Sequence, residues 1–142
     1  MQNKKEEVMV GGLAKTATRG SKMGKEAVGE IVGILFMSRT YAHMAHLKTG
    51  SFAKHKALNE FYDEVVELAD TLAEAGQGEW GKLDVPYVAM GSDVGDPISG
   101  ISEQWQMIEE AAGGCDKPYI ENILQEIEAL YKKTLYLLKE LN

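Results

Sequence analysis

The chain has 142 residues, of which 44% are hydrophobic and 26% charged, and its formal net charge is −7. That length fits one domain with a hydrophobic core of its own. Because Cys115 is the only cysteine, an intrachain disulfide and a zinc site built on cysteines are both excluded. No apolar run is long enough to span a bilayer, and no apolar stretch follows the first lysines as in a signal peptide. We therefore expect a cytoplasmic protein without a membrane partner.

The charge is unevenly distributed along the chain. Residues 1–25 carry six basic side chains against Glu6 and Glu7, a net charge of +4, so the remainder carries −11. We interpret residues 1–21 as a flexible basic N-terminal arm. Such an arm on an acidic body can contact nucleic acid, another assembly protein or a neighbouring subunit, or it can be a solvated tail. Residues 1–25 contain no Phe, Tyr or Trp, so they lack the aromatic side chains of a single-strand binder.

Residues 22–142 are predicted to form a bundle of four helices. Apolar residues repeat at intervals of three and four in four segments, which we expect to be helices: about 21–46, 52–75, 98–112 and 117–141. The short turn between the first two makes them an antiparallel pair. Residues 76–96, rich in Gly and closed by Pro97, are too many for a bundle turn and are predicted to run along the bundle as a crossover. The expected fold class is all-α, with two antiparallel helix pairs joined by a long crossover.

The second predicted helix carries a polar stripe beside its apolar one. The stripe combines one histidine and one amide with carboxylates at helical spacing: His55, Asn59, Asp63, Glu67, Asp70 and Glu74. His43 and His46 lie near the end of the first helix, so the three histidines of the chain surround one turn. Imidazole nitrogen and carboxylate oxygen together suit iron, and bundles build metal sites between helices. In the alternative interpretation, the carboxylates form a solvated face and the histidines cap or pack the helices.

Any metal site on this stripe needs a second copy of the chain. The C-terminal half contains no histidine, so the Glu-x-x-His motifs that di-iron bundles carry on two helices are absent. We therefore expect a homo-oligomer with an inter-subunit site. No phosphate-binding glycine loop and no G-x-S-x-G motif occurs, and Cys115 is interpreted as a packing residue. No catalytic residue is singled out, and whether the protein is an enzyme stays open.

The spacing of these residues resembles the inter-subunit ferroxidase pattern of the Dps family, the ferritin-like DNA-binding proteins of starved cells. That pattern is His, eleven residues, His, three, Asp, ten, Asp, three, Glu. Here the positions are occupied, at the same spacing, by His43, His55, Asn59, Asp70 and Glu74. Asn59 stands where the family has a carboxylate, and Asp63 one turn later is out of register. The turn from His46 to Gly50 is similar to the family's His-Trp-Asn-x-x-Gly, and that alignment makes His46 the first ligand instead of His43.

The resemblance covers about residues 41–76. The segment 46–78 is more particularly similar to uncharacterised Dps-like proteins that are frequent in bacteriophage genomes. The resemblance implies a ferritin-like bundle, a cage-like homo-oligomer, a role for the basic arm, and oxidation of ferrous iron between the histidines of one subunit and the carboxylates of another. Asn59, the short third helix and the crossover poor in helix depart from the family. They favour the alternative, a non-enzymatic structural or assembly protein, such as a phage component located within the virion.

Overall fold

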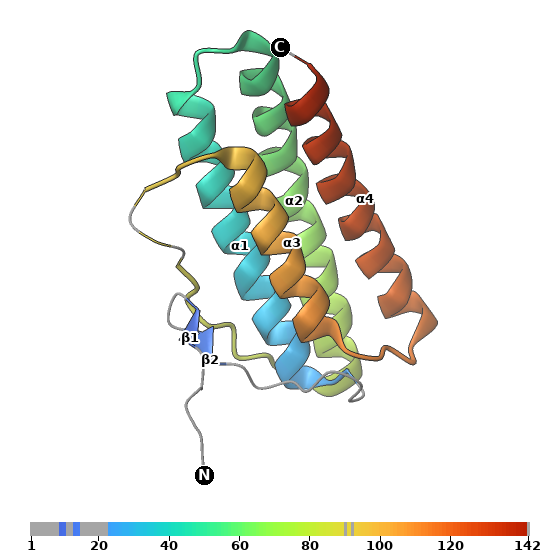
Figure 1. Ribbon diagram of the computed structural model, residues 1–142. Helices are drawn as coiled ribbons and strands as arrows, with labels where there is room; N and C mark the ends of the chain where they lie inside the picture. Colours follow the sequence, from blue (N-terminus) through green and yellow to red (C-terminus); the bar gives the residue numbers. More distant parts are fainter. Residues whose placement is uncertain (1–8, 11–12, 15–22, 90, 92, 142) are drawn as a thin grey trace.

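The computed structural model describes residues 9–10, 13–14, 23–89, 91 and 93–141. The described part contains four helices: α1 (Lys25–Lys48), α2 (Phe52–Trp80), α3 (Pro97–Ala112) and α4 (Pro118–Glu140) (Figure 1). Two short strands, β1 (Met9–Val10) and β2 (Leu13–Ala14), pair in antiparallel fashion before them. The expectation of an all-α bundle of four helices is confirmed. The arm predicted for residues 1–21 lies outside the described residues, except for the backbone of these two strands.

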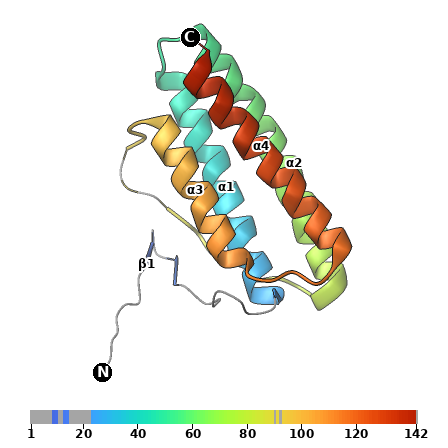
Figure 2. The ribbon, with the colours of Figure 1, turned by 45° about the vertical axis from the view of Figure 1, so that its right-hand side comes forward.

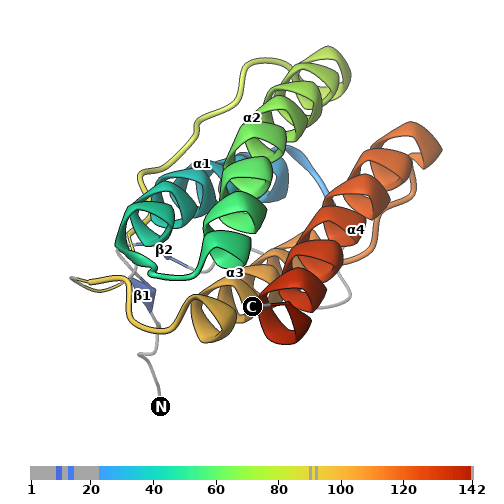
Figure 3. The ribbon, with the colours of Figure 1, turned by 90° about the horizontal axis from the view of Figure 1, so that it is seen from above.

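Every neighbouring pair of helices in the bundle is antiparallel. Helix α1 packs against α2 and α3, and α4 packs against the same two, which places the helices at four corners when the bundle is seen from above (Figure 3). Helix α3 begins beside the C-terminal half of α1, where the Tyr41 hydroxyl donates to the Asp96 backbone oxygen at 3.2 Å. It ends beside the start of α1, where the Met23 N–H donates to the Gly114 oxygen at 2.6 Å. Helices α2 and α3 therefore run in the same direction.

A crossover segment, residues 81–96, connects these two parallel helices. It passes from the end of α2 to the start of α3 along the outside of α1 (Figures 1 and 2). Glycines in α1 allow this close approach, because a Cβ atom on Gly33 would lie only 2.7 Å from the Pro86 backbone oxygen, and one on Gly29 would clash with that of Asp84. Helix α1 thus packs against α2 and α3 on one side and closely against the crossover segment on the other.

Helix α2 extends further than the sequence pattern predicts. We expected it to end at Ala75, with Gly76 past its end, but it continues to Trp80. Gly76 is buried, and a Cβ atom there would lie 2.9 Å from Cγ1 of Val28. This glycine permits α1 and α2 to approach each other and does not end the helix.

Side chains cap the first turn of two helices. The Ser51 hydroxyl accepts from the Lys54 N–H at 3.2 Å at the start of α2. Asp96 accepts from the Ile98 N–H at 3.3 Å, ahead of Pro97 in the first turn of α3. None of the helices in the described part combines the length and the apolarity needed to cross a membrane.

Candidate functional site

The three histidines lie together where α1 turns into α2. The rings of His46 and His55 stack with their centroids 3.6 Å apart, and His43 stacks on Tyr62 at 4.1 Å. The edge-on contacts of His46 with His43 and Tyr62, at 5.8 and 5.3 Å, join the two stacks. The four rings form one aromatic cluster between the two helices.

Two reciprocal hydrogen bonds fix the orientation of His46 and His55. The Nδ1 atom of His46 lies 2.9 Å from the backbone oxygen of His55, and the Nδ1 atom of His55 lies 3.0 Å from that of His46. Because a carbonyl oxygen only accepts, we assign the proton of each ring to Nδ1, which leaves a lone pair on Nε2. Metal-binding histidines commonly donate from one ring nitrogen in this way and bind the metal through the other. The same two bonds also clamp the turn between α1 and α2.

Asn59, the neutral residue in the polar stripe, is engaged within its own helix. Its Nδ2 donates to Asp63 Oδ2 at 2.9 Å, and its Oδ1 accepts from the Tyr62 hydroxyl at 3.2 Å. Tyr62 in turn lies on His43, so the amide is coupled to the histidine cluster through a tyrosine. Both ends of the Asn59 side chain thus have partners other than a metal.

The carboxylates farther along α2 do not reach the histidines. Asp70 and Glu74 are exposed, and at 1.5 Å rise per residue Asp70 lies about 22 Å along the helix from His55. No group of three or more His, Cys, Asp or Glu side chains within the described residues is placed to hold a metal ion. The structure brings the three histidines together but leaves the carboxylates apart, so the inter-subunit metal site stays a prediction.

A groove lies between α1 and the crossover, on the side of α1 that faces away from the core. Its volume is about 440 Å³, and its walls come from α1 and from residues 85–89, 91, 93 and 94 of the crossover. One stripe of α1 faces outward here, at spacings of three and four: Gly29, Gly33, Phe36, Thr40, Met44 and Leu47. The crossover covers the two glycines, whereas the larger residues that follow remain open to solvent.

The open part of this surface is apolar. Phe36 and Met44 on α1 are 38% and 51% exposed, and Leu47 one turn later is 73% exposed; on the crossover, Val85 and Tyr87 are 43% and 100% exposed. We call these five residues the α1–crossover face. This face was not predicted from the sequence. The part of it on α1 is visible there, because Phe36, Met44 and Leu47 share one side of the helix, opposite the residues that face the core.

Tyr41 fixes the end of the crossover to α1. Its hydroxyl lies 2.7 Å from the backbone oxygen of Val94 and 3.2 Å from that of Asp96, and can donate to either. Burial, with smaller contributions from the negative charges of Asp96, Glu103 and Asp93, raises the pKa of Tyr41 to about 12. A neutral hydroxyl therefore holds the wall of the groove in place throughout the physiological pH range.

Comparison with known proteins identifies the family. Residues 46–138 match the model of a family of unknown function, DUF5856. The chain belongs to the DUF5856 family. It is also 28% identical over 121 residues to an "Uncharacterized 14.6 kDa protein in mobD-ri intergenic region" of Enterobacteria phage T4, across 83% of this chain and 93% of that protein. No solved structure matches the chain.

These matches correct the family resemblance drawn from the sequence. The family model, over residues 46–138, covers most of the segment that carried the likeness to Dps, yet it describes DUF5856 and not a Dps or ferritin-like family. Assignment to Dps is therefore wrong. The physical reason is that polar residues on one face of any α-helix recur every three or four residues. A similar spacing of His, Asp and Glu can therefore arise on helices outside the Dps family.

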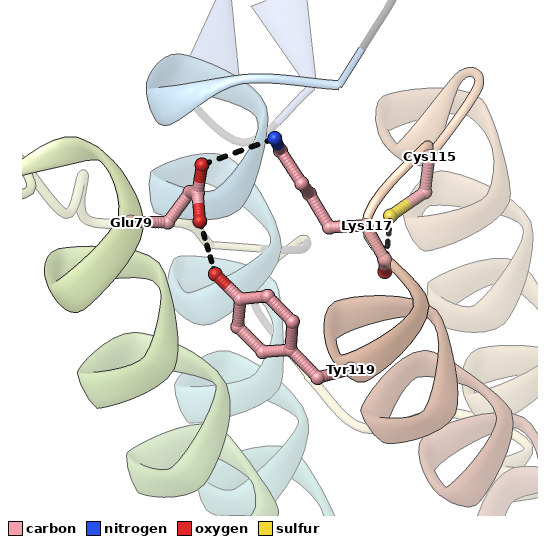
Figure 4. Close-up of polar contacts among 4 residues, drawn as sticks. All are labelled: Glu79, Cys115, Lys117 and Tyr119. Carbon is pink, nitrogen blue, oxygen red and sulfur yellow. Dashed lines mark hydrogen bonds and ion pairs between the residues drawn. The ribbon is translucent and has the colours of Figure 1, made fainter.

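Within the region matched by the DUF5856 model, one further polar cluster connects α2 to α4 (Figure 4). Glu79 accepts from the Tyr119 hydroxyl and lies 3.3 Å from Lys117 Nζ. Hydrogen bonds from Tyr119 and Lys117 lower the pKa of the Glu79 carboxyl, and the bond to Glu79 raises the pKa of Tyr119. Cys115 Sγ donates to the Lys117 backbone oxygen at 3.6 Å. This cluster joins the ends of two helices at the surface, a structural role.

Proposed function

We propose that this DUF5856 protein is a non-enzymatic, phage-encoded assembly protein that acts by binding other protein subunits through its α1–crossover face. The observation that carries the proposal is the exposure of five large apolar side chains, four of which line one groove while Leu47 lies one turn beyond it on α1. Soluble monomers rarely leave contiguous apolar patches of several hundred Å² open unless the patch binds something. The relative in phage T4 supports a phage origin, and we accordingly propose that the protein occurs in the infected cell and in the virion.

The construction of the face supports a binding role. One wall is a helix that packs on two others, and the second wall is held at Tyr41 and against the glycines of α1. A surface fixed in this way loses little conformational freedom on binding, so more of the contact energy appears as affinity. Neither the histidine cluster nor the cluster around Glu79 opens into the groove.

Sedimentation of host extracts tests this proposal. The variant that combines Met44→Glu with Leu47→Glu places two charges on the face, whereas Tyr136→Glu changes a residue of α4 that is 59% exposed. We expect the wild type and Tyr136→Glu to sediment with an assembly much larger than one chain, and the double variant to remain near the top of the gradient. The proposal fails if all three sediment alike.

A second candidate function is iron binding between copies, and the orientation of His46 and His55 favours it. Their Nε2 atoms carry the lone pairs, so together with His43 they offer imidazole ligands. Asp70 and Glu74 of another copy would supply carboxylate oxygens, which ferrous and ferric iron prefer. Aerobic oxidation of ferrous iron by the wild type, lost in His55→Ala combined with Glu74→Ala, would support this function. Oxidation no faster than in buffer would exclude it.

The basic residues 1–25 are proposed as a second contact of the same assembly. With a net charge of +4 against −11 for the rest of the chain, they suit an acidic partner surface, a neighbouring subunit or nucleic acid. This contact is separate from the α1–crossover face and can be removed by truncation.

A further inference from the structure

We infer that the α1–crossover face binds the same face of a second copy, so that two chains pair about a two-fold axis that runs along their α1 helices. The inference rests on the proposed function, because it names the partner of the face. It commits to a homodimer, in which each copy covers the groove of the other.

The exposed area matches what a dimer of this kind requires. The exposed fractions of the five side chains add up to about three whole side chains. At about 150–250 Å² for a large side chain, this is roughly 600 Å² of apolar surface. A standard interface buries about 800 Å² per partner, of which about 65% is apolar in homodimers, or roughly 500 Å². The face is therefore large enough to form the apolar centre of one complete interface.

The face also carries opposite charges on its two sides. Arg39 is exposed on the side of α1 away from the crossover, and Asp93 is exposed on the crossover and lines the groove beside Tyr41. A two-fold rotation about an axis parallel to α1 places the crossover side of each copy opposite the other side of its partner. Positions along the helix axis do not change, so Arg39 of each copy faces Asp93 of the other. Paired charges of this kind select the register and suppress wrong partners.

Tyr87 is the anchor of the proposed interface. It is fully exposed at the edge of the groove, whereas Leu83 and Val88 on the same segment are half-buried. Tyrosine is enriched at interface hot spots because its ring fills a pocket while its hydroxyl finds a polar partner. In the dimer, the crossover of each copy lies opposite α1 of the other, so each Tyr87 ring packs against α1 of its partner.

The test is the mass of the purified full-length protein across a dilution series, measured by light scattering and sedimentation equilibrium. We expect twice the 15.6 kDa of one chain. The double variant Met44→Glu with Leu47→Glu should have the mass of one chain, whereas Tyr136→Glu should keep the mass of two. Tyr87→Ala should raise the dissociation constant by about ten-fold or more. Circular dichroism should show that all variants keep the helix content of the wild type.

Charge exchange tests the direction of the axis. Arg39→Asp and Asp93→Arg should each weaken the dimer, and the two changes together should restore it. A wild-type mass of one chain at every concentration overturns the inference, and so does a mass of two chains that the double variant retains. If the pure protein is monomeric yet sediments with a large assembly in host extracts, the second copy is refuted while the proposed function stands. A dimer that never joins a larger assembly refutes the proposed function instead.

Discussion

Replacement of Gly33 by alanine tests the packing of the crossover on α1. In an open helix this change stabilises by about 1 kcal/mol, because alanine loses less backbone entropy on folding. Here the new methyl group would lie 2.7 Å from the Pro86 oxygen and 3.2 Å from Cγ2 of Val88. The nearer atom is backbone and cannot rotate away, so the crossover must move, and overpacking of this kind costs about 1–3 kcal/mol. The two effects together give an expected net destabilisation of up to about 2 kcal/mol.

Urea unfolding followed by circular dichroism measures this effect. Gly78→Ala in α2 is the matched control, because nothing lies within 4 Å of the position where its Cβ would be added. That change should stabilise the protein by about 0.5–1 kcal/mol. The two glycine-to-alanine changes should therefore shift the unfolding midpoint in opposite directions. If Gly33→Ala stabilises as much as Gly78→Ala, the crossover is not packed on α1 as described.

Four further predictions concern the core, the groove wall and the N-terminal segment. Tyr131→Phe should cost about 1–2 kcal/mol in urea unfolding, because it removes the buried hydrogen bond of 2.7 Å to Ser38 Oγ. Gln104→Met should stabilise by about 1–2 kcal/mol, because both polar atoms of this fully buried side chain lack a hydrogen-bond partner in the described structure; a loss of stability would refute this. Between pH 10 and 12 the unfolded chain releases the Tyr41 proton that the folded chain still holds, so stability should fall as pH rises, and less steeply in Tyr41→Phe. Deletion of residues 1–22 should abolish salt-sensitive binding to heparin or duplex DNA and leave the melting temperature unchanged. If the shortened protein binds as well as the full chain, the binding surface lies on the helical bundle instead.

Helical periodicity was sufficient to predict the class of fold. Buried residues such as Ile127, Leu130 and Tyr131 in α4 recur at three and four, and the core consists of residues with this spacing. The ends of the helices were harder to predict, because a glycine has two meanings. Gly76 resembles a helix stop in the sequence, but its buried position against Val28 shows that it permits close packing. Only the residue packed against the glycine, here Val28, distinguishes a glycine that ends a helix from one that permits close helix packing.

The sequence was less informative about the candidate site. It drew attention to the three histidines, which the structure brings together because they lie close in the chain on either side of one turn. It did not show the reciprocal hydrogen bonds of His46 and His55, which depend on the path of the backbone through the turn. The α1–crossover face was missed because its exposure depends on which residues of α1 the crossover covers: it lies against Gly29 and Gly33 and leaves Phe36 and Met44 open. That position is a tertiary property.

We propose the α1–crossover face as the contact surface of this protein in its host. The most direct measurement is site-specific photo-crosslinking in host cells, with the crosslinking residue at position 44 or, as a control, at position 136, both of which are exposed. We predict a discrete covalent adduct from position 44, identified by mass spectrometry as this chain or another assembly protein, and none of that mass from position 136. The absence of an adduct at position 44, or the same adducts from both positions, would contradict the account.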